Sequence, residues 1–107
     1  MTAFVSDAEF DAAVLEAPVP VLVDFWADWC APCKAMDPVL EQLAAEFEGR
    51  VRIVKLDVAA NPATTIRFGV RNMPTMMLFK DGEPTDMRVG GGQSRVQLTK
   101  WLESHAA

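Results

Sequence analysis

Two cysteines, Cys30 and Cys33, are the residues of this sequence best suited to chemistry, and the chain contains no others. They are separated by two residues and follow an apolar run from Val21 to Trp26. If a helix begins here, positions i and i+3 lie on one of its faces. Their Cα atoms can then approach to the roughly 4.4 to 6.8 Å that a disulfide needs. The spacing therefore predicts a disulfide that can form and break with little backbone movement.

The expected helix also supplies the reactivity. Cys30 would lie at or just before the helix N-terminus, where unpaired N–H groups and the helix dipole favour an anion. This position lowers the pKa of a cysteine below its free value of about 8.5, and the thiolate is the form that attacks disulfides. Pro32 suits the first helical turn, and Lys34 adds a positive charge nearby. Cys33, one turn deeper, is expected to be the less exposed, resolving thiol.

Two other interpretations of the cysteine pair, a zinc site and a structural disulfide, have less support. A zinc site usually has four ligands, and the only other soft candidate is His105, which we expect to be solvated near the C-terminus. A structural disulfide across two intervening residues closes too small a loop to stabilise the fold much. Redox catalysis is therefore the favoured interpretation.

Asp24 is the next most informative residue. It lies among apolar neighbours within the run from Val21 to Trp26. An ionised carboxylate buried there costs several kcal/mol unless it is paired, so its pKa is expected to rise. The alternative is that the side chain reaches water at a strand end.

The elements that would position these residues follow from apolar periodicity and turn signals. Five strands are expected, at Phe4–Val5, Val21–Trp26, Val51–Asp57, Thr75–Lys80 and Thr85–Val89. The second strand is apolar on both faces, which is typical of a central strand covered by helices. Asp81-Gly82 predicts a hairpin turn between the last two strands.

Helices are expected between these strands. Ser6 to Glu9 resembles a capping box that opens a first helix, with Phe10, Ala13 and Val14 on its buried face. The longest helix would run from the cysteines to about Phe47, bent but not ended by Pro38. A short helix would follow Asn61-Pro62 and end at Gly69, and Ser94 would cap the last one. Trp26 and Trp101 are expected in the core.

Three features, taken together, resemble a known family. They are the segment Trp29-Cys30-Ala31-Pro32-Cys33-Lys34, Asp24 six residues before Cys30, and Met73-Pro74-Thr75 further along the chain. This combination resembles the thioredoxin family, and the similarity extends from about Phe4 to the C-terminus. Ala31 departs from the family pattern, in which glycine is usual. The resemblance implies an α/β protein with the thioredoxin fold, a central mixed five-stranded sheet flanked by four helices, as a single domain over residues 1–107.

The resemblance also implies roles around the cysteines. Asp24 would accept a proton from Cys33, through a water molecule, and Lys55 on the neighbouring strand would lie close to it. Pro74 would be cis and would face the cysteines. The backbone of Met73 would pair with an extended peptide by strand addition.

A flat apolar surface around the Cys30 sulfur would bind the substrate. Glycine in such a surface lets the backbone of many different proteins approach closely. Taken alone, Gly90-Gly91-Gly92 is equally consistent with an ordinary loop. Trp29 would shield the sulfur. The residues expected in this surface are Ala31, Pro32, Met73, Pro74, Val89, Gly90 and Gly91.

The composition limits the class of partner. The chain has 107 residues, of which 50% are apolar, and a net charge of −5, which argues against nucleic acids and anionic membranes as partners. No apolar run approaches the roughly 18 residues of a membrane span, and the first residues lack the pattern of a secretory signal. We therefore expect a cytoplasmic protein, as a monomer. No glycine-rich phosphate loop is present, so no bound cofactor is expected. By resemblance, electrons would come from NADPH through the flavoprotein thioredoxin reductase.

The favoured function is a protein disulfide reductase that donates electrons to disulfide-containing proteins. A disulfide oxidase or isomerase on the same fold is a first alternative, although such relatives usually carry histidine between the cysteines, where this chain has Ala31-Pro32. A binding module that uses the fold as a scaffold is a second. Replacing both cysteines by serine would distinguish the binding module from a reductase, because only the binding module would keep its activity.

Overall fold

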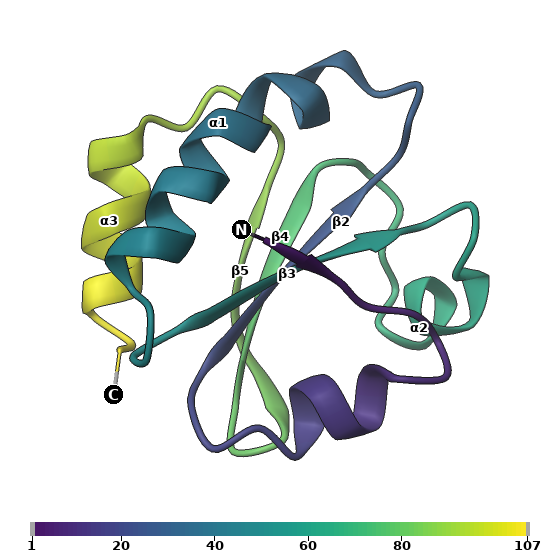
Figure 1. Cartoon of the computed structure of the whole chain (residues 1–107). Helices are drawn as coiled ribbons and strands as arrows, with labels where there is room; N and C mark the ends of the chain where they lie inside the picture. Colours follow the sequence, from purple (N-terminus) through teal and green to yellow (C-terminus); the bar gives the residue numbers. More distant parts are fainter. Residues whose placement is uncertain (1, 107) are drawn as a thin grey trace.

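A mixed five-stranded sheet forms the centre of the structure, a computed structural model that describes residues 2–106 (Figure 1). The strands are β1 (Ala3–Phe4), β2 (Val21–Trp26), β3 (Arg52–Asp57), β4 (Thr75–Lys80) and β5 (Glu83–Val89). Their order across the sheet is β1-β3-β2-β4-β5. The first three neighbours run parallel, and β4 and β5 are antiparallel additions. The predicted α/β class and mixed sheet are confirmed.

The central strand β2 pairs with β3 on one side and β4 on the other. Between β2 and β3 the chain forms α1 (Ala31–Glu46), giving the predicted β-α-β unit with parallel strands. Every residue of β2 before Trp26 is buried, as the apolar sequence predicted. The helix continues through Pro38 to Glu46, also as expected.

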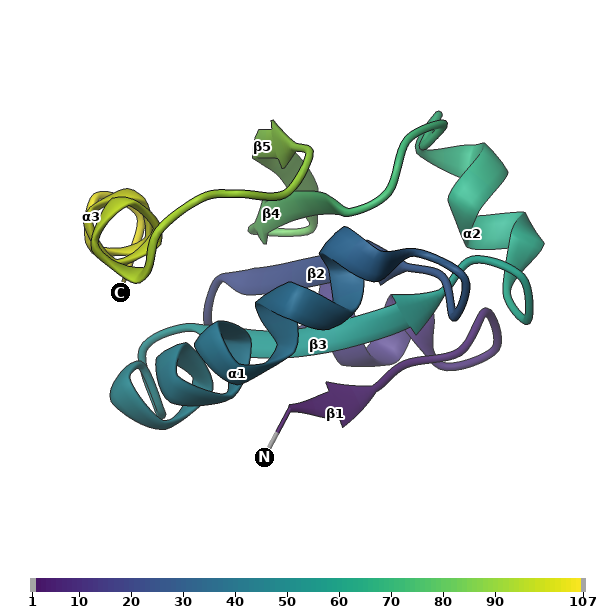
Figure 2. The ribbon, with the colours of Figure 1, turned by 90° about the horizontal axis from the view of Figure 1, so that it is seen from above.

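Helices cover both faces of the sheet. Figure 1 shows α1 and α3 (Arg95–Glu103) side by side, and Figure 2 shows the short π-helix η1 (Asp11–Leu15) on the opposite side of the sheet from α1. The fourth helix, α2 (Pro62–Arg67), leads into Phe68, which packs in the η1 core. Alternate residues of β2 therefore enter two separate cores, with Leu22 under α1 and α3, and Val23 under η1.

The first helix differs from its prediction. Glu9 does accept hydrogen bonds from the Ser6 N–H at 3.2 Å and the Ser6 hydroxyl at 2.8 Å. The Ser6 hydroxyl is thus occupied by the carboxylate and caps no backbone N–H, so only half of a capping box forms. The helical segment that follows is π-helical and begins only at Asp11. The apolar face was predicted correctly, because Phe10 and Val14 are buried and Ala13 packs against them.

Asp7, in the same segment, caps a different helix. Its carboxylate accepts hydrogen bonds from the backbone N–H groups of Ala63 at 3.2 Å and Thr64 at 2.9 Å. These N–H groups lie in the first turn of α2, where the helix itself provides no acceptor. Asp7 therefore caps a helix more than fifty residues away, which a search for local capping pairs does not find.

The other turns and caps agree with the prediction. Ser94 and Gln97 form a complete capping box at the start of α3. Asp81 and Gly82 turn the chain between β4 and β5 with φ values of 53° and 82°. Positive φ at both positions is what a tight two-residue hairpin requires.

Two side chains, those of Trp26 and His105, differ from expectation in their burial. Trp26 is only half-buried and lies outside both apolar cores, whereas Trp101 is buried as predicted. His105, expected to be solvated, has a side chain only 21% exposed, and its Nε2 lies 3.2 Å from Oδ2 of Asp86. Asp86 also accepts the Trp101 indole N–H at 2.7 Å. The end of α3 is thus held against β5, which removes His105 from solvent.

Within residues 2–106, every helix is too short or too polar to traverse a bilayer.

Candidate active site

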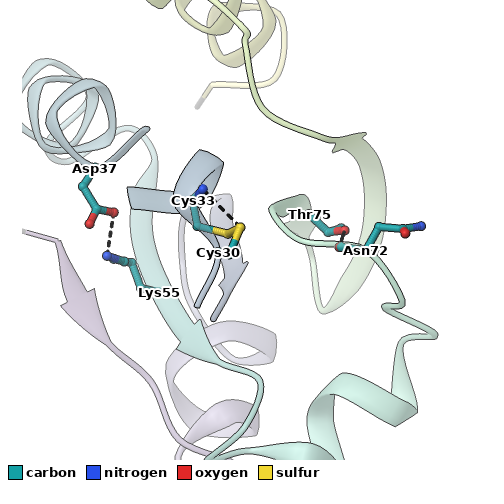
Figure 3. Close-up of a disulfide and its surroundings, with 6 residues drawn as sticks. All are labelled: Cys30, Cys33, Asp37, Lys55, Asn72 and Thr75. Carbon is teal, nitrogen blue, oxygen red and sulfur yellow. Dashed lines mark hydrogen bonds and ion pairs between the residues drawn. A yellow bond between two sulfur atoms is a disulfide. The ribbon is translucent and has the colours of Figure 1, made fainter. Parts of the chain in front are cut away.

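The cysteine pair lies where β2 passes into α1 (Figure 3). Cys30 is the N-cap residue of α1, with extended backbone angles, and Pro32 lies in the first turn. The two cysteines form a disulfide with a Cα–Cα distance of 5.3 Å. The Cys33 backbone N–H donates a hydrogen bond to Cys30 Sγ at 3.2 Å. A sulfur atom therefore fills the capping role that an oxygen usually has at a helix N-terminus.

The two sulfurs have different surroundings. Cys33 is 1% exposed and lies on the buried face of α1, whereas Cys30 is half-buried at the helix end. The prediction that Cys33 is the less exposed cysteine is confirmed. Lys34 contributes less than expected, because its Nζ lies 3.5 Å from Asp28 Oδ1 in an exposed ion pair. The peptide N–H groups at the start of α1, among them the Cys33 N–H bonded to Cys30 Sγ, provide positive potential at Cys30.

Asp24 lies beneath α1 in the middle of β2. Its side chain is 1% exposed, and neither carboxylate oxygen has a hydrogen-bond partner among the residues that the structure describes. Burial raises the pKa of Asp24 to about 7, against a lowering by the positive charge of Lys55 and a further raising by Asp37. The expected rise is confirmed, and the alternative of a carboxylate reaching water at a strand end is wrong. Asp24 can exchange a proton near neutral pH.

Lys55 occupies the expected strand position but has another partner. Its backbone lies in register with Asp24 across β2 and β3. Its Nζ, however, contacts Asp37 Oδ1 at 2.6 Å, as Figure 3 shows. The ammonium also lies 4.5 Å from the centroid of the Trp26 ring.

Asp37 is the residue of this site that the sequence analysis missed. It lies four residues after Cys33, so both side chains share one face of α1. This spacing was the available signal. A single carboxylate on a helix is, however, most often a solvated one, and nothing local distinguishes Asp37 from those.

The predicted substrate surface combines three distant segments. The Met73–Pro74 peptide bond is cis, and the Pro74 carbonyl accepts a hydrogen bond from the Gly90 N–H at 2.8 Å. Gly91 packs against the first turn of α1, because a Cβ added to it would lie 3.0 Å from Cβ of Pro32. Asn72 and Thr75 flank this loop, and Figure 3 shows them across the disulfide from Asp37 and Lys55.

The outer part of this surface is open to solvent. Trp29 is 69% exposed and Val89 is 52% exposed, and Ala31 is exposed as well. Pro74 is buried and Met73 half-buried. The structure thus connects Pro74 to Gly90 by a hydrogen bond and Gly91 to Pro32 by packing, and it leaves the large apolar side chain of Trp29, next to Cys30 in the sequence, exposed.

Metal binding has no comparable support. Among residues 2–106, no group of three or more His, Cys, Asp and Glu side chains is arranged to hold a metal ion. His105, the candidate considered with the cysteines, lies beside Asp86 instead.

Comparison with known proteins agrees with this geometry. A family model described as Thioredoxin matches residues 1–104. The chain is 53% identical over 100 residues to thioredoxin C-2 of Corynebacterium nephridii, covering 94% of this chain and 92% of that protein. It is 50% identical over 101 residues to thioredoxin of Staphylococcus aureus, covering 94% of each chain. Thioredoxin of Haemophilus influenzae is 45% identical over 101 residues, with the same coverage. The chain therefore belongs to the thioredoxin family and is a thiol–disulfide oxidoreductase that acts through Cys30 and Cys33.

Proposed function

We propose that this chain is a protein disulfide reductase that acts as a general cytoplasmic electron donor to disulfide-containing proteins. The observation that carries the proposal is the placement of Cys30 Sγ at the N-cap of α1, where it accepts the Cys33 N–H at 3.2 Å. In the reduced protein a thiolate at this position gains from the same N–H group and from the helix dipole. Cys33, one turn deeper, is buried and is proposed to act as the resolving thiol in the second step.

The first step is attack on the substrate. The Cys30 thiolate attacks one sulfur of a disulfide in the partner protein, forming a mixed disulfide. The broken substrate S–S bond leaves its electron pair on the second substrate sulfur, which departs as a thiolate and takes up a proton.

The second step releases the product. The Cys33 thiol gives its proton to the Asp24 carboxylate, through a water molecule, and the resulting thiolate attacks Cys30 Sγ. The Cys30–Cys33 bond forms as the mixed disulfide breaks, and the remaining substrate sulfur leaves as a thiolate. Asp24 suits this role because its pKa of about 7 lets it accept and return a proton near neutral pH. Lys55 acts on Asp24 from the neighbouring strand, where its positive charge opposes the rise of the Asp24 pKa caused by burial.

The substrate would bind beside the disulfide. An extended segment of the partner would pair with the backbone of Met73 and lie against apolar side chains and glycine backbone. The residues proposed for this surface are Trp29, Ala31, Pro32, Met73, Pro74, Val89, Gly90 and Gly91.

The oxidised protein must be reduced again by another protein. We assign this role to a flavoprotein thioredoxin reductase that takes electrons from NADPH, with no cofactor bound by the chain itself. Residues 1–107 would act as one monomeric domain.

A coupled assay of protein-disulfide reduction tests this function. The parent chain should reduce insulin disulfides with electrons from NADPH and a thioredoxin reductase. Cys30→Ser should abolish turnover, because the attacking thiolate is lost. Cys33→Ser should still attack but accumulate the mixed disulfide, since the resolving thiol is missing. Full turnover by Cys30→Ser, or no trapped adduct with Cys33→Ser, would contradict the proposal.

A further inference from the structure

Three charged side chains lie together in the layer between α1 and the sheet. In β2, Leu22 faces α1, so the alternation of a strand places Asp24 on the same face. In β3, Ile53 likewise faces α1, and Lys55 follows it two residues later. Asp37 approaches from the helix itself. The strands and the helix thus bring two carboxylates and one ammonium together, with Asp24 buried under α1 and Asp37 at the partly exposed margin.

The ammonium is shared unequally between the two carboxylates. Lys55 Nζ lies 2.6 Å from Asp37 Oδ1, which is the short distance of a charge-assisted hydrogen bond. The Lys55 side chain is 10% exposed and that of Asp37 is 40% exposed. The Trp26 ring, 4.5 Å from Nζ, lies against the same ammonium. Asp24 receives no hydrogen bond from Lys55, although the two residues are in register.

The charges that act on Asp24 can be named from each element packed against it. Lys55 contributes the positive charge from β3, and Asp37 contributes a negative charge from α1. Cys33 lies on α1 one turn before Asp37, and Met76, the β4 residue opposite Asp24, is uncharged. Glu41, one turn after Asp37, is held by the Thr2 backbone N–H at 2.9 Å, and Lys55 helps to lower its pKa. Asp37 is thus the negative charge that both acts on Asp24 and binds its cation.

We propose that Asp37 is a positioning residue for the proton transfer between Cys33 and Asp24, because it binds the Lys55 ammonium and keeps it from pairing with the Asp24 carboxylate. This inference rests on the role proposed for Asp24. A carboxylate paired with an ammonium is a weaker base, since the opposite charge favours its ionised form. With the ammonium on Asp37, Asp24 takes the Cys33 proton more readily and returns it after the new disulfide has formed.

The carboxyl titration of Asp24 tests the inference directly. In the oxidised protein, ¹³C NMR follows the Asp24 carboxyl carbon from acidic to alkaline pH. Asp37→Asn removes a negative charge and releases Lys55, so the Asp24 midpoint should fall by about 1 pH unit. Asp37→Glu keeps a carboxylate for Lys55, and its midpoint should stay close to that of the parent. Lys55→Met removes the cation and should raise the midpoint, which gives a second variant with the opposite sign.

Asp28→Asn is the matched control. It removes the same charge from an exposed ion pair with Lys34, beside the cysteines but outside the group of charges that act on Asp24. Its Asp24 midpoint should equal that of the parent. An unchanged midpoint in Asp37→Asn, or an equal fall in Asp28→Asn, would overturn the inference.

The reaction supplies a readout that a merely structural role would not move. The rate at which Cys33 resolves a mixed disulfide should rise with pH as Asp24 ionises, and in Asp37→Asn the half-maximal pH should fall together with the NMR midpoint. A kinetic profile that stays in place while the NMR midpoint moves would overturn the role of Asp37 in the reaction. Failure of the role proposed for Asp24 is recognised separately, because Asp24→Asn would then resolve the mixed disulfide as fast as the parent. Failure of the reductase function would instead leave Cys30→Ser with full turnover.

Discussion

Cys30 and Cys33 differ in reactivity because a helix begins between them. Cys30 Sγ accepts the Cys33 N–H in the first turn of α1, while Cys33 is buried against the sheet. Asp24 lies on the same buried side of α1, with a pKa of about 7 and no hydrogen-bond partner among residues 2–106. One thiol is therefore prepared for attack and the other for resolution with the help of a base.

The first prediction concerns Asp24 at the resolving step. Asp24→Asn should slow the attack of Cys33 on a preformed mixed disulfide by about 100-fold near neutral pH, because a positioned base of matched pKa is lost. The release of a labelled peptide thiol from a Cys30–peptide disulfide measures this step alone. Asp28→Asn is the control, since it removes an exposed carboxylate from the same region. If both variants release the peptide at the parent rate, Asp24 has no part in the mechanism.

The disulfide between Cys30 and Cys33 and the burial of Asp24 were predictable because these residue types are informative in their local context. A cysteine pair at this spacing and a carboxylate inside an apolar strand are both unusual, so Cys30, Cys33 and Asp24 could be identified without coordinates. Asp37 could not, because its significance comes from Lys55, which is eighteen residues away in sequence and lies on another element.

The candidate active site is formed where the ends of several helices and strands come together. The start of α1, the loop before β4 and the loop after β5 converge, with Pro74 bonded to Gly90 and Gly91 packed against Pro32. On the other side of the sheet, Asp7 joins the N-terminal segment to α2. The Pro74–Gly90 and Asp7–α2 junctions use backbone groups at the ends of strands and helices, whereas Gly91 and Pro32 meet by van der Waals contact.

The cap on α2 gives a prediction of its own. Asp7→Ala should lower the melting temperature by a few degrees, because the N–H groups of Ala63 and Thr64 lose their acceptor. Asp7→Asn, which keeps one acceptor oxygen, should lose less. Hydrogen bonds from Thr64 and Ala63 lower the pKa of Asp7. A lowered folded pKa stabilises the fold above the unfolded value of 3.8, and this contribution is lost as pH falls through the lower folded value.

Thermal unfolding from neutral to strongly acidic pH checks this. The difference between the parent and Asp7→Ala should be full at neutral pH and should shrink only below about pH 4. A difference that does not depend on pH would show that the charge on Asp7 contributes nothing to the cap.

Elements with strong periodicity were predicted well, whereas the first helix was not. The bounds of β2 and β4 agree with the expected ones residue for residue, because their buried runs are bounded by clear breaks. In the N-terminal segment, the Ser6 hydroxyl bonds to the Glu9 carboxylate and the Asp7 carboxylate bonds to the distant helix α2, so neither side chain caps the first helix. A contact with a distant element, such as that of Asp7 with α2, cannot be predicted from a local sequence pattern.

For the whole molecule, the two cores on opposite faces of the sheet have different roles. The core under η1 contains an aromatic cluster, with Phe10, Phe68 and Phe79 in mutual ring contact. The layer under α1 also contains Asp24 and Lys55. Burying the Asp24 carboxylate costs the fold free energy whenever it is ionised, and the reaction needs this same ionisation.

The pH dependence of global stability measures that cost. The folded pKa of Asp24, about 7, lies above the unfolded value of 3.8, so the folded state binds more protons between these values. The free energy of unfolding should therefore fall as pH rises through this window. Relative to Asp24→Asn, the parent should lose at most about 4 kcal/mol between pH 4 and pH 8.

Urea unfolding of the oxidised protein provides the comparison. Asp28→Asn is again the control. It removes an exposed carboxylate, and its pH profile should match that of the parent. Parallel profiles for the parent and Asp24→Asn would mean that Asp24 is ionised throughout this pH range in the folded protein.

The pH dependence of Cys30 alkylation in the reduced protein tests directly whether the start of α1 activates this cysteine. If the N-cap position of α1 stabilises a thiolate, iodoacetamide should modify Cys30 well before Cys33. The rate should reach its half-maximum at least about 1 pH unit below the 8.5 of a free cysteine. A midpoint at about 8.5, or faster modification of Cys33, would contradict the mechanism proposed for this site.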